Sequence, residues 1–107
     1  MIIKSSKLQK KKRGNMKITE YKINQEFSGA IIEIDGRHGK IKCTGEDRIY
    51  FILSGKGKFI IDGKSGTVSK SDLIFIPKNT PYDISGKLRY FLISNPEFDP
   101  KHDVVLE

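Results

Sequence analysis

Residues 46–63 of the chain read "EDRIYFILSGKGKFIIDG". The stretch contains two runs rich in β-branched and aromatic residues, "RIYFIL" (48–53) and "KFIID" (58–62). Between them stands "SGKG", a sequence of the kind that breaks or turns a chain. Two such runs on either side of a glycine turn predict two strands joined as a hairpin.

The two faces of the first run differ. Successive side chains of an extended strand point to opposite sides. Arg48, Tyr50 and Ile52 therefore share one face, which mixes polar and apolar groups. The opposite face is wholly apolar and consists of Ile49, Phe51 and Leu53. If the mixed face lines the inside of a barrel, the apolar face has to be covered by another sheet or another subunit.

The rest of the chain after residue 27 shows the same organisation. Further short runs are "AIIEID" (30–35), "DLIFI" (72–76) and "LRYFLI" (88–93), separated by turn sequences such as "DGKSG" and "PKNTP". No segment has a sustained helical period. Many short strands at this spacing predict an all-β sandwich or barrel.

Composition limits the class of protein. A chain of 107 residues makes one domain, and its 36% hydrophobic content without Trp suggests a thin core that a partner chain completes. No run approaches the ~20 apolar residues of a membrane span, and the N-terminus lacks the apolar core of a signal peptide. The single cysteine, Cys43, cannot form an internal disulfide. We therefore expect a cytoplasmic protein without a membrane partner.

The net charge of +7 comes from the N-terminus. Seven of the 20 Lys and Arg residues lie in residues 1–17, which contain no acid, so the remainder of the chain has 13 basic and 13 acidic residues. The arm has no aromatic side chain to stack on bases, and the rest shows no basic stripe, so we expect no nucleic-acid partner. We assign 1–17 to a basic N-terminal extension and 18–107 to the barrel domain. Since "MKITEYKIN" resembles an ordinary protein start, Met16 is an alternative start.

Residues 29–94 resemble a small single-domain cupin. The first cupin motif has a glycine, a His-x-His pair, a glutamate and a second glycine at fixed spacings. Gly36 and Gly55 match the two glycines, whereas Lys42, Thr44 and Arg48 replace the three metal ligands. At the conserved positions of the second motif stand Ser71, Pro77, Asn79, Tyr82 and Gly86, and only the proline matches. The resemblance implies a cupin-type antiparallel β-barrel, also called a double-stranded β-helix or jelly roll.

The replaced residues argue against metal chemistry. Lys and Arg have no lone pair to donate at neutral pH and repel a divalent cation. No His-x-His sequence exists, and we expect the two histidines, His38 and His102, to be solvated surface residues. The sequence therefore predicts no metal and no other cofactor.

Strand alternation places a set of polar residues inside such a barrel. We predict a ligand site there that consists of Lys42, Thr44, Arg48, Tyr50 and Tyr82. An Arg guanidinium offers a planar fork for a carboxylate or phosphate, and the hydroxyl groups can orient a ligand. This favours a small anionic or sugar-derived ligand. The competing interpretation leaves Lys42 and Arg48 at an open rim in bulk water.

Three functions remain open. The leading one is a metal-free small-molecule-binding protein, which we expect to be a homodimer. The second is a metal-independent sugar isomerase or epimerase of carbohydrate biosynthesis, because cupin-related enzymes of that kind use a His base with a Tyr or Lys acid. No catalytic residue is assigned, since neither histidine falls on a predicted core strand and Asp83 has the opposite parity to Tyr82. The third is a structural or regulatory dimer without a ligand.

Overall fold

Two 15-residue strands, β5 (Asp47–Ile61) and β8 (Pro81–Asn95), run antiparallel beside each other along almost their whole length. The computed structural model describes all residues from 1 to 107. The other strands are β1 (Lys10–Arg13), β2 (Met16–Lys22), β3 (Ser28–Arg37), β4 (Ile41–Cys43), β6 (Lys64–Ser69), β7 (Leu73–Ile76) and β9 (Asp103–Val105). The two helices are single 3-10 turns, η1 (Ser5–Lys7) and η2 (Pro100–His102), and no helix is long and apolar enough to cross a membrane.

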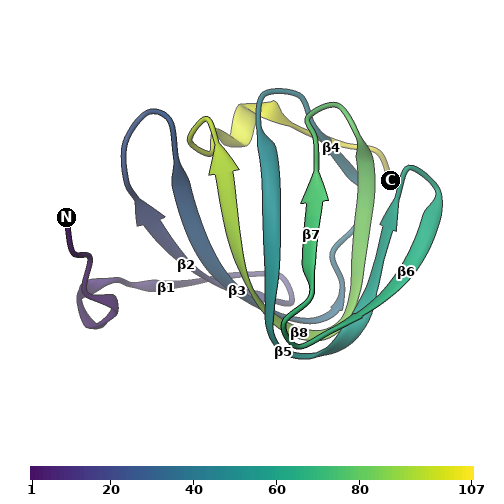
Figure 1. Ribbon diagram of the computed structural model, residues 1–107, viewed down its shortest axis with the longest axis horizontal. Coiled ribbons are helices and arrows are strands. Elements are labelled where there is room, and N and C mark those ends of the chain that lie inside the picture. Colours follow the sequence, from purple (N-terminus) through teal and green to yellow (C-terminus); the bar gives the residue numbers. More distant parts are fainter.

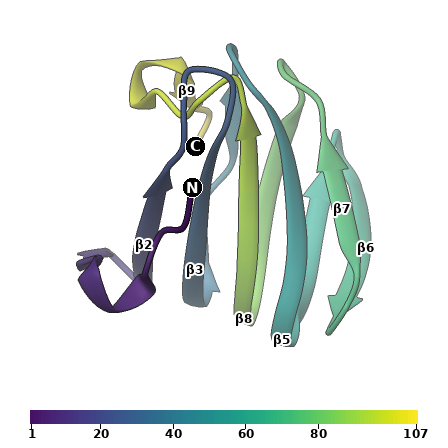
Figure 2. The same cartoon turned by 60° about the vertical axis from the view of Figure 1, so that its left-hand side comes forward.

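The strands form one antiparallel sheet that curls into a barrel (Figure 1). The C-terminal part of β8 lies between β3 and the first part of β5, whereas its N-terminal part pairs with β4 and the second part of β5. β6 and β7 pair with the two ends of β5. Figure 2 shows the neighbouring strands β2, β3, β8, β5 and β7 side by side. The predicted all-β antiparallel barrel is confirmed.

The predicted glycine turn inside residues 46–63 is wrong. The chain continues through "SGKG" as part of β5, with a register shift between Ile52 and Ser54. Gly55 has a φ of +92°, and a Cβ atom at this position would lie 2.0 Å from the carbonyl oxygen of Lys87 on β8. A residue without a Cβ is therefore required where the two long strands bend together. The actual turn follows β5, at Asp62 and Gly63.

Side-chain alternation along β5 follows the sequence prediction. Arg48, Tyr50 and Ile52 are buried in the barrel, whereas Ile49 and Phe51 are 39% and 38% exposed on the outer face. The core continues around the barrel with inward-facing residues of the other strands, chiefly Ile32, Ile34, Phe59, Ile74, Ile76, Tyr82, Ile84, Leu88, Tyr90 and Leu92. The first half of β5 thus supplies both the polar interior and an apolar exterior.

Part of the N-terminal extension lies in the sheet. β1 pairs with β2 through the two-residue loop Gly14–Asn15, and the positive φ of +58° at Gly14 suits the first position of a tight hairpin turn. The Asn15 side chain donates to the carbonyl oxygens of Asp35 (3.1 Å) and Arg37 (3.0 Å). The basic strand β1 is therefore held at the sheet edge, next to the end of β3.

Candidate functional site

Arg48 is the centre of a buried polar cluster. Its Nη2 atom donates to Glu46 (3.1 Å) and to Asp103 (2.8 Å), and its Nη1 donates to the hydroxyl of Tyr82 (2.9 Å). The guanidinium also lies over the ring of Phe98, 5.5 Å from the ring centroid. Since Arg48 is only 3% exposed, its charge is buried and is compensated by two carboxylates.

Glu46 links Arg48 to a histidine. This residue stands immediately before β5, is fully buried, and its Oε2 atom lies 2.5 Å from Nδ1 of His102. The pairing of β4 with β9 brings Cys43 opposite Asp103 and so carries His102 to this position. Gly45 leaves the necessary space, because a Cβ atom there would lie 2.2 Å from the histidine ring. A carboxylate at Nδ1 fixes the orientation of an imidazole ring.

Three tyrosines extend the cluster into the core. The hydroxyl groups of Tyr50 and Tyr82 are 2.5 Å apart, and the ring of Tyr90 meets that of Tyr50 edge to face at 5.2 Å. Burial raises the pKa of Tyr82, and burial together with Tyr82 raises the pKa of Tyr50 well above its usual value. Both phenols are therefore neutral proton donors at neutral pH. Burial alone would lower the pKa of Arg48, but Tyr82, Tyr50 and Asp103 raise it overall, so it stays charged.

The five predicted ligand residues do not all meet. Arg48, Tyr50 and Tyr82 come together inside the barrel, where the hydroxyl of Tyr82 hydrogen-bonds to both Arg48 and Tyr50. Lys42 alternates with the buried residues Ile41 and Cys43, so it lies on the opposite face of β4. Thr44 is exposed, and its hydroxyl donates to the carbonyl oxygen of His102 (3.1 Å). The expectation that Lys42 and Thr44 line the interior is corrected, because β4 turns its apolar residues inward.

Three members of the cluster, Glu46, His102 and Asp103, were not predicted as site residues. Glu46 does share the strand parity of Arg48, which is the one local signal that could have indicated it. No local pattern marks the other two, because they reach the cluster only through η2 and β9. The expectation that His102 is merely a solvated surface residue is wrong. Its side chain is 38% exposed, but its ring contacts the buried carboxylate of Glu46.

The two remaining polar residues discussed from the sequence lie beside the cluster. His38, also expected at the surface, is half-buried and stacks against Tyr82 with 6.1 Å between the ring centroids. Asp83 points away from the tyrosines, as expected, yet it is buried and accepts from Arg37 (2.6 Å) and from the backbone of Gly39 (2.9 Å). Neither residue adds a group to the cluster around Arg48.

A metal ion does not fit this cluster. The guanidinium of Arg48 bridges Glu46 and Asp103, which would otherwise be the carboxylate ligands. A divalent cation at this place would meet a fixed positive charge and would compete with Arg48 for the same oxygen atoms. No group of three or more His, Cys, Asp or Glu side chains is arranged to hold a metal.

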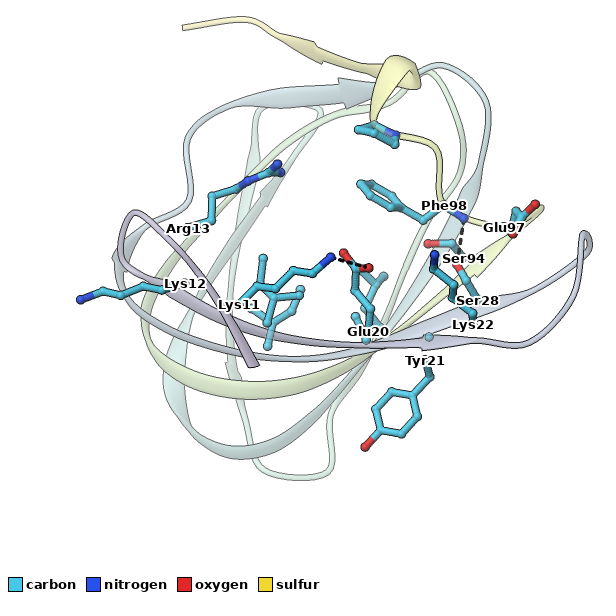
Figure 3. A pocket seen from close by; sticks show the side chains of 16 residues that line it. Lys11, Lys12, Arg13, Glu20, Tyr21, Lys22, Ser28, Ser94, Glu97 and Phe98 are labelled. Carbon is cyan, nitrogen blue, oxygen red and sulfur yellow. Dashed lines mark hydrogen bonds and ion pairs between the residues drawn. The ribbon is translucent and has the colours of Figure 1, made fainter. Parts of the chain in front are cut away.

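An open cavity of about 540 Å³ lies beside the cluster (Figure 3). Its apolar wall includes Ile18, Ala30, Ile32, Leu92 and Phe98. Ser28 and Ser94 add hydroxyl groups, and the Ser28 oxygen accepts from the backbone N–H of Phe98 (2.8 Å). Ser94 is the cross-strand partner of Arg48, and Phe98 stacks on that guanidinium. The polar cluster is therefore one layer of side chains behind the cavity wall.

These features define a cupin-fold protein with a polar interior in which an arginine takes the central place. Solved structures with high similarity to the chain are cupin-fold proteins. Pac13 of Streptomyces, a nucleoside dehydratase, has a TM-score of 0.92 at 16% identity, over 100% of this chain and 91% of Pac13. Variants of Pac13 in which a tyrosine or a histidine is replaced have been solved with uridine.

Other proteins are similar to the chain in structure or in sequence. KdgF from Halomonas sp. has a TM-score of 0.86 at 11% identity, over 94% of this chain and 97% of KdgF. The Schizosaccharomyces pombe Cnp3 cupin domain has a TM-score of 0.75 at 15% identity, over 85% and 70% of the two chains. An uncharacterized protein of Methanocaldococcus jannaschii is 28% identical over 89 residues, which are 79% of this chain and 71% of that protein. No protein-family profile matches the chain.

Proposed function

We propose that this chain binds a small anionic or sugar-derived molecule in the cavity of its cupin barrel, without a metal ion. The observation that carries the proposal is the cavity itself. Its volume of about 540 Å³ lies in the range of small-molecule pockets, and it combines an apolar wall with a few polar groups. Pac13, which has the same fold, has been solved with uridine, a molecule of suitable size.

The buried cluster supports this role from behind the wall. The Nε atom of Arg48 is buried and has no hydrogen-bond partner. An unpaired buried donor is costly, so it favours an acceptor arriving from a neighbouring space. Phe98 and Ser94 line the cavity and adjoin Arg48, so an oxygen of a ligand would reach this donor only if these side chains moved aside.

An NMR titration tests the binding site. The ¹⁵N-labelled protein is titrated with uridine, ribose 5-phosphate and ribose. We expect at least one of them to shift amide signals centred on Ala30, Leu92 and Ser94. Ala30→Phe, which fills the cavity, should abolish the shifts, whereas Ile31→Phe on the opposite face of β3 should preserve them. Shifts that survive Ala30→Phe, or their complete absence with all three compounds, would contradict the proposal.

A second candidate function, a metal-independent sugar isomerase or epimerase, is favoured by one contact. The 2.5 Å contact between Glu46 and Nδ1 of His102 orients an imidazole, the side chain that most often serves as a general base, in the cluster around Arg48. The neutral phenol of Tyr82, next to Arg48, provides an acid in the same cluster. An oriented histidine and a neutral phenol in one cluster are the two kinds of group that such an enzyme needs as base and acid.

Exchange of carbon-bound hydrogen tests the enzyme. Nucleotide-linked ketosugars are incubated with the protein in D₂O, and deuterium incorporation is followed by NMR. We expect exchange with the wild type, its loss in His102→Gln, and normal exchange in the neighbouring exposed variant Lys101→Gln. If the wild type catalyses no exchange, or His102→Gln exchanges at the wild-type rate, the acid–base role fails while the binding proposal stands.

A further inference from the structure

The basic strand β1 forms one edge of the cavity. Lys11 pairs with Ile18 and Arg13 with Met16, so these two cations share the inward face of the hairpin with the apolar residues of β2. Lys12 pairs with Lys17 and lies on the other face. Figure 3 shows the same arrangement, with Arg13 and Lys11 directed over the cavity and Lys12 directed away from it.

The charges around the cavity are unequally neutralised. Lys11 is paired with Glu20, at 3.4 Å between Nζ and Oε2. Arg48, which the sequence indicated as the anion receptor, already has two carboxylate partners. Arg13, by contrast, has no ion pair and no side-chain hydrogen bond to the protein, although its side chain lies at the mouth of the cavity. Lys22 and Glu97 also line the cavity without an ion pair, but their opposite charges offset each other. The available positive charge is therefore at the mouth and not in the barrel centre.

The wall opposite this charge suits a flat apolar group. The ring of Phe98 lines the cavity, and its backbone is held by the hydrogen bond to Ser28. Leu92 and Ile32 continue the apolar surface across β8 and β3. In Figure 3 Arg13 and Phe98 lie on different sides of the opening. A ligand that spans the opening meets a cation at one end and an aromatic surface at the other.

We infer that the cavity binds an amphipathic anion whose phosphate or carboxylate group is recognised by Arg13, while its ring or other apolar body lies against Phe98 and Leu92. The inference rests on the proposed function and deepens it: it moves the anion-binding group from Arg48 to strand β1. Arg13 can bind such a group through two parallel N–H donors. Since this end of the site is open to solvent, the contact is weaker and more salt-sensitive than a buried pair.

Three probes with one ring system test the inference. 2-Naphthyl phosphate, 2-naphthoate and neutral 2-naphthol are titrated against the ¹⁵N-labelled full-length chain, and the amide signals of Ala30 and Leu92 report binding in the cavity. We expect both anions to bind more tightly than 2-naphthol at low salt. Arg13→Ala should weaken anion binding about fivefold and leave 2-naphthol unchanged. Lys10→Ala, the loss of one charge from the same strand at a position that does not line the cavity, should change neither.

The three probes and the two variants distinguish the possible outcomes. The ratio between 2-naphthyl phosphate and 2-naphthoate shows which anion the subsite favours, and either preference supports it. If all three probes bind the cavity equally, or Arg13→Ala affects 2-naphthol as much as the anions, the anion subsite is wrong but the cavity remains a binding site. Equal effects of Arg13→Ala and Lys10→Ala would also overturn it, since they indicate only a diffuse charge. If no probe shifts the cavity amides, this inference fails, whereas the proposed function is judged by its own titration.

Discussion

Glu46 and His102 are 56 residues apart in the chain, yet Glu46 Oε2 lies 2.5 Å from Nδ1 of His102. The other oxygen of the same carboxylate accepts from Arg48 at 3.1 Å. One fully buried carboxylate thus connects a cation in the barrel with a histidine on the C-terminal segment. The C-terminal residues are therefore part of the polar interior, and the consequences can be measured.

Removing the charge of Glu46 should destabilise the fold. Glu46→Gln leaves the buried Arg48 with only Asp103 as a charged partner, and breaking a buried pair costs about 3 kcal/mol. Urea unfolding measures the loss. The matched control is Glu33→Gln, which removes an exposed pair with Arg89 at 3.5 Å and should cost less than about 1 kcal/mol. Equal losses in the two variants would show that the buried pair contributes no more than a surface one.

Alkaline pH should unfold the protein through its buried tyrosines. Burial raises the pKa of Tyr50, Tyr82 and Tyr90 above the usual value of about 10 that they regain in the unfolded chain. Above that pH the unfolded state releases protons that the folded state retains, so the free energy of unfolding falls as pH rises. Stability should therefore decline above about pH 10, as measured by urea unfolding at a series of pH values.

The variant Tyr50→Phe provides the control for this pH dependence. It removes one buried phenol without changing the ring packing, so the decline above about pH 10 should become less steep. A slope equal to that of the wild type would mean that Tyr50 does not contribute to the alkaline transition.

The outer face of β5 and β7 should form a homodimer interface. Ile49 and Phe51 are exposed there beside Leu73 and Phe75, which are 62% and 54% exposed. Contiguous apolar side chains of this kind mark interaction surfaces. Light scattering at micromolar concentration should give twice the chain mass of 12.2 kDa. Phe75→Lys should produce a monomer, whereas Val105→Lys, at another exposed apolar position, should not. A wild-type monomer would exclude this interface.

The purified protein should contain far less than one transition-metal ion per chain after a chelator wash. The reason is the guanidinium of Arg48, which holds Glu46 and Asp103 and repels a divalent cation. Elemental analysis of the washed protein measures the metal content for Fe, Mn, Zn and Ni. Stoichiometric metal that survives the wash and shifts or broadens the NMR signals of the cluster would contradict the expected absence of a cofactor.

Much of the fold could be predicted from short segments. The alternation of Arg48, Tyr50 and Ile52 with Ile49 and Phe51 identified both faces of β5, because the two-residue period of a strand is a local property of the backbone. The continuation of that strand through Gly55 could not be predicted. A glycine permits both a tight turn and a close approach of two strands, and only the position of Lys87 on β8 distinguishes them.

The sequence by itself determined the all-β class, the inward position of Arg48, Tyr50 and Tyr82, and the presence of Lys42, Thr44 and Arg48 in place of the three cupin metal ligands. Only the tertiary structure decided that Arg48 is neutralised by Glu46 and Asp103, that His102 joins this cluster, and that Arg13 reaches the cavity. The physical reason is that these contacts depend on the pairing of β4 with β9 and of β1 with β2. Which distant strands pair depends on burial and hydrogen bonding of the whole barrel, whereas the pattern within one strand reports only its own two faces.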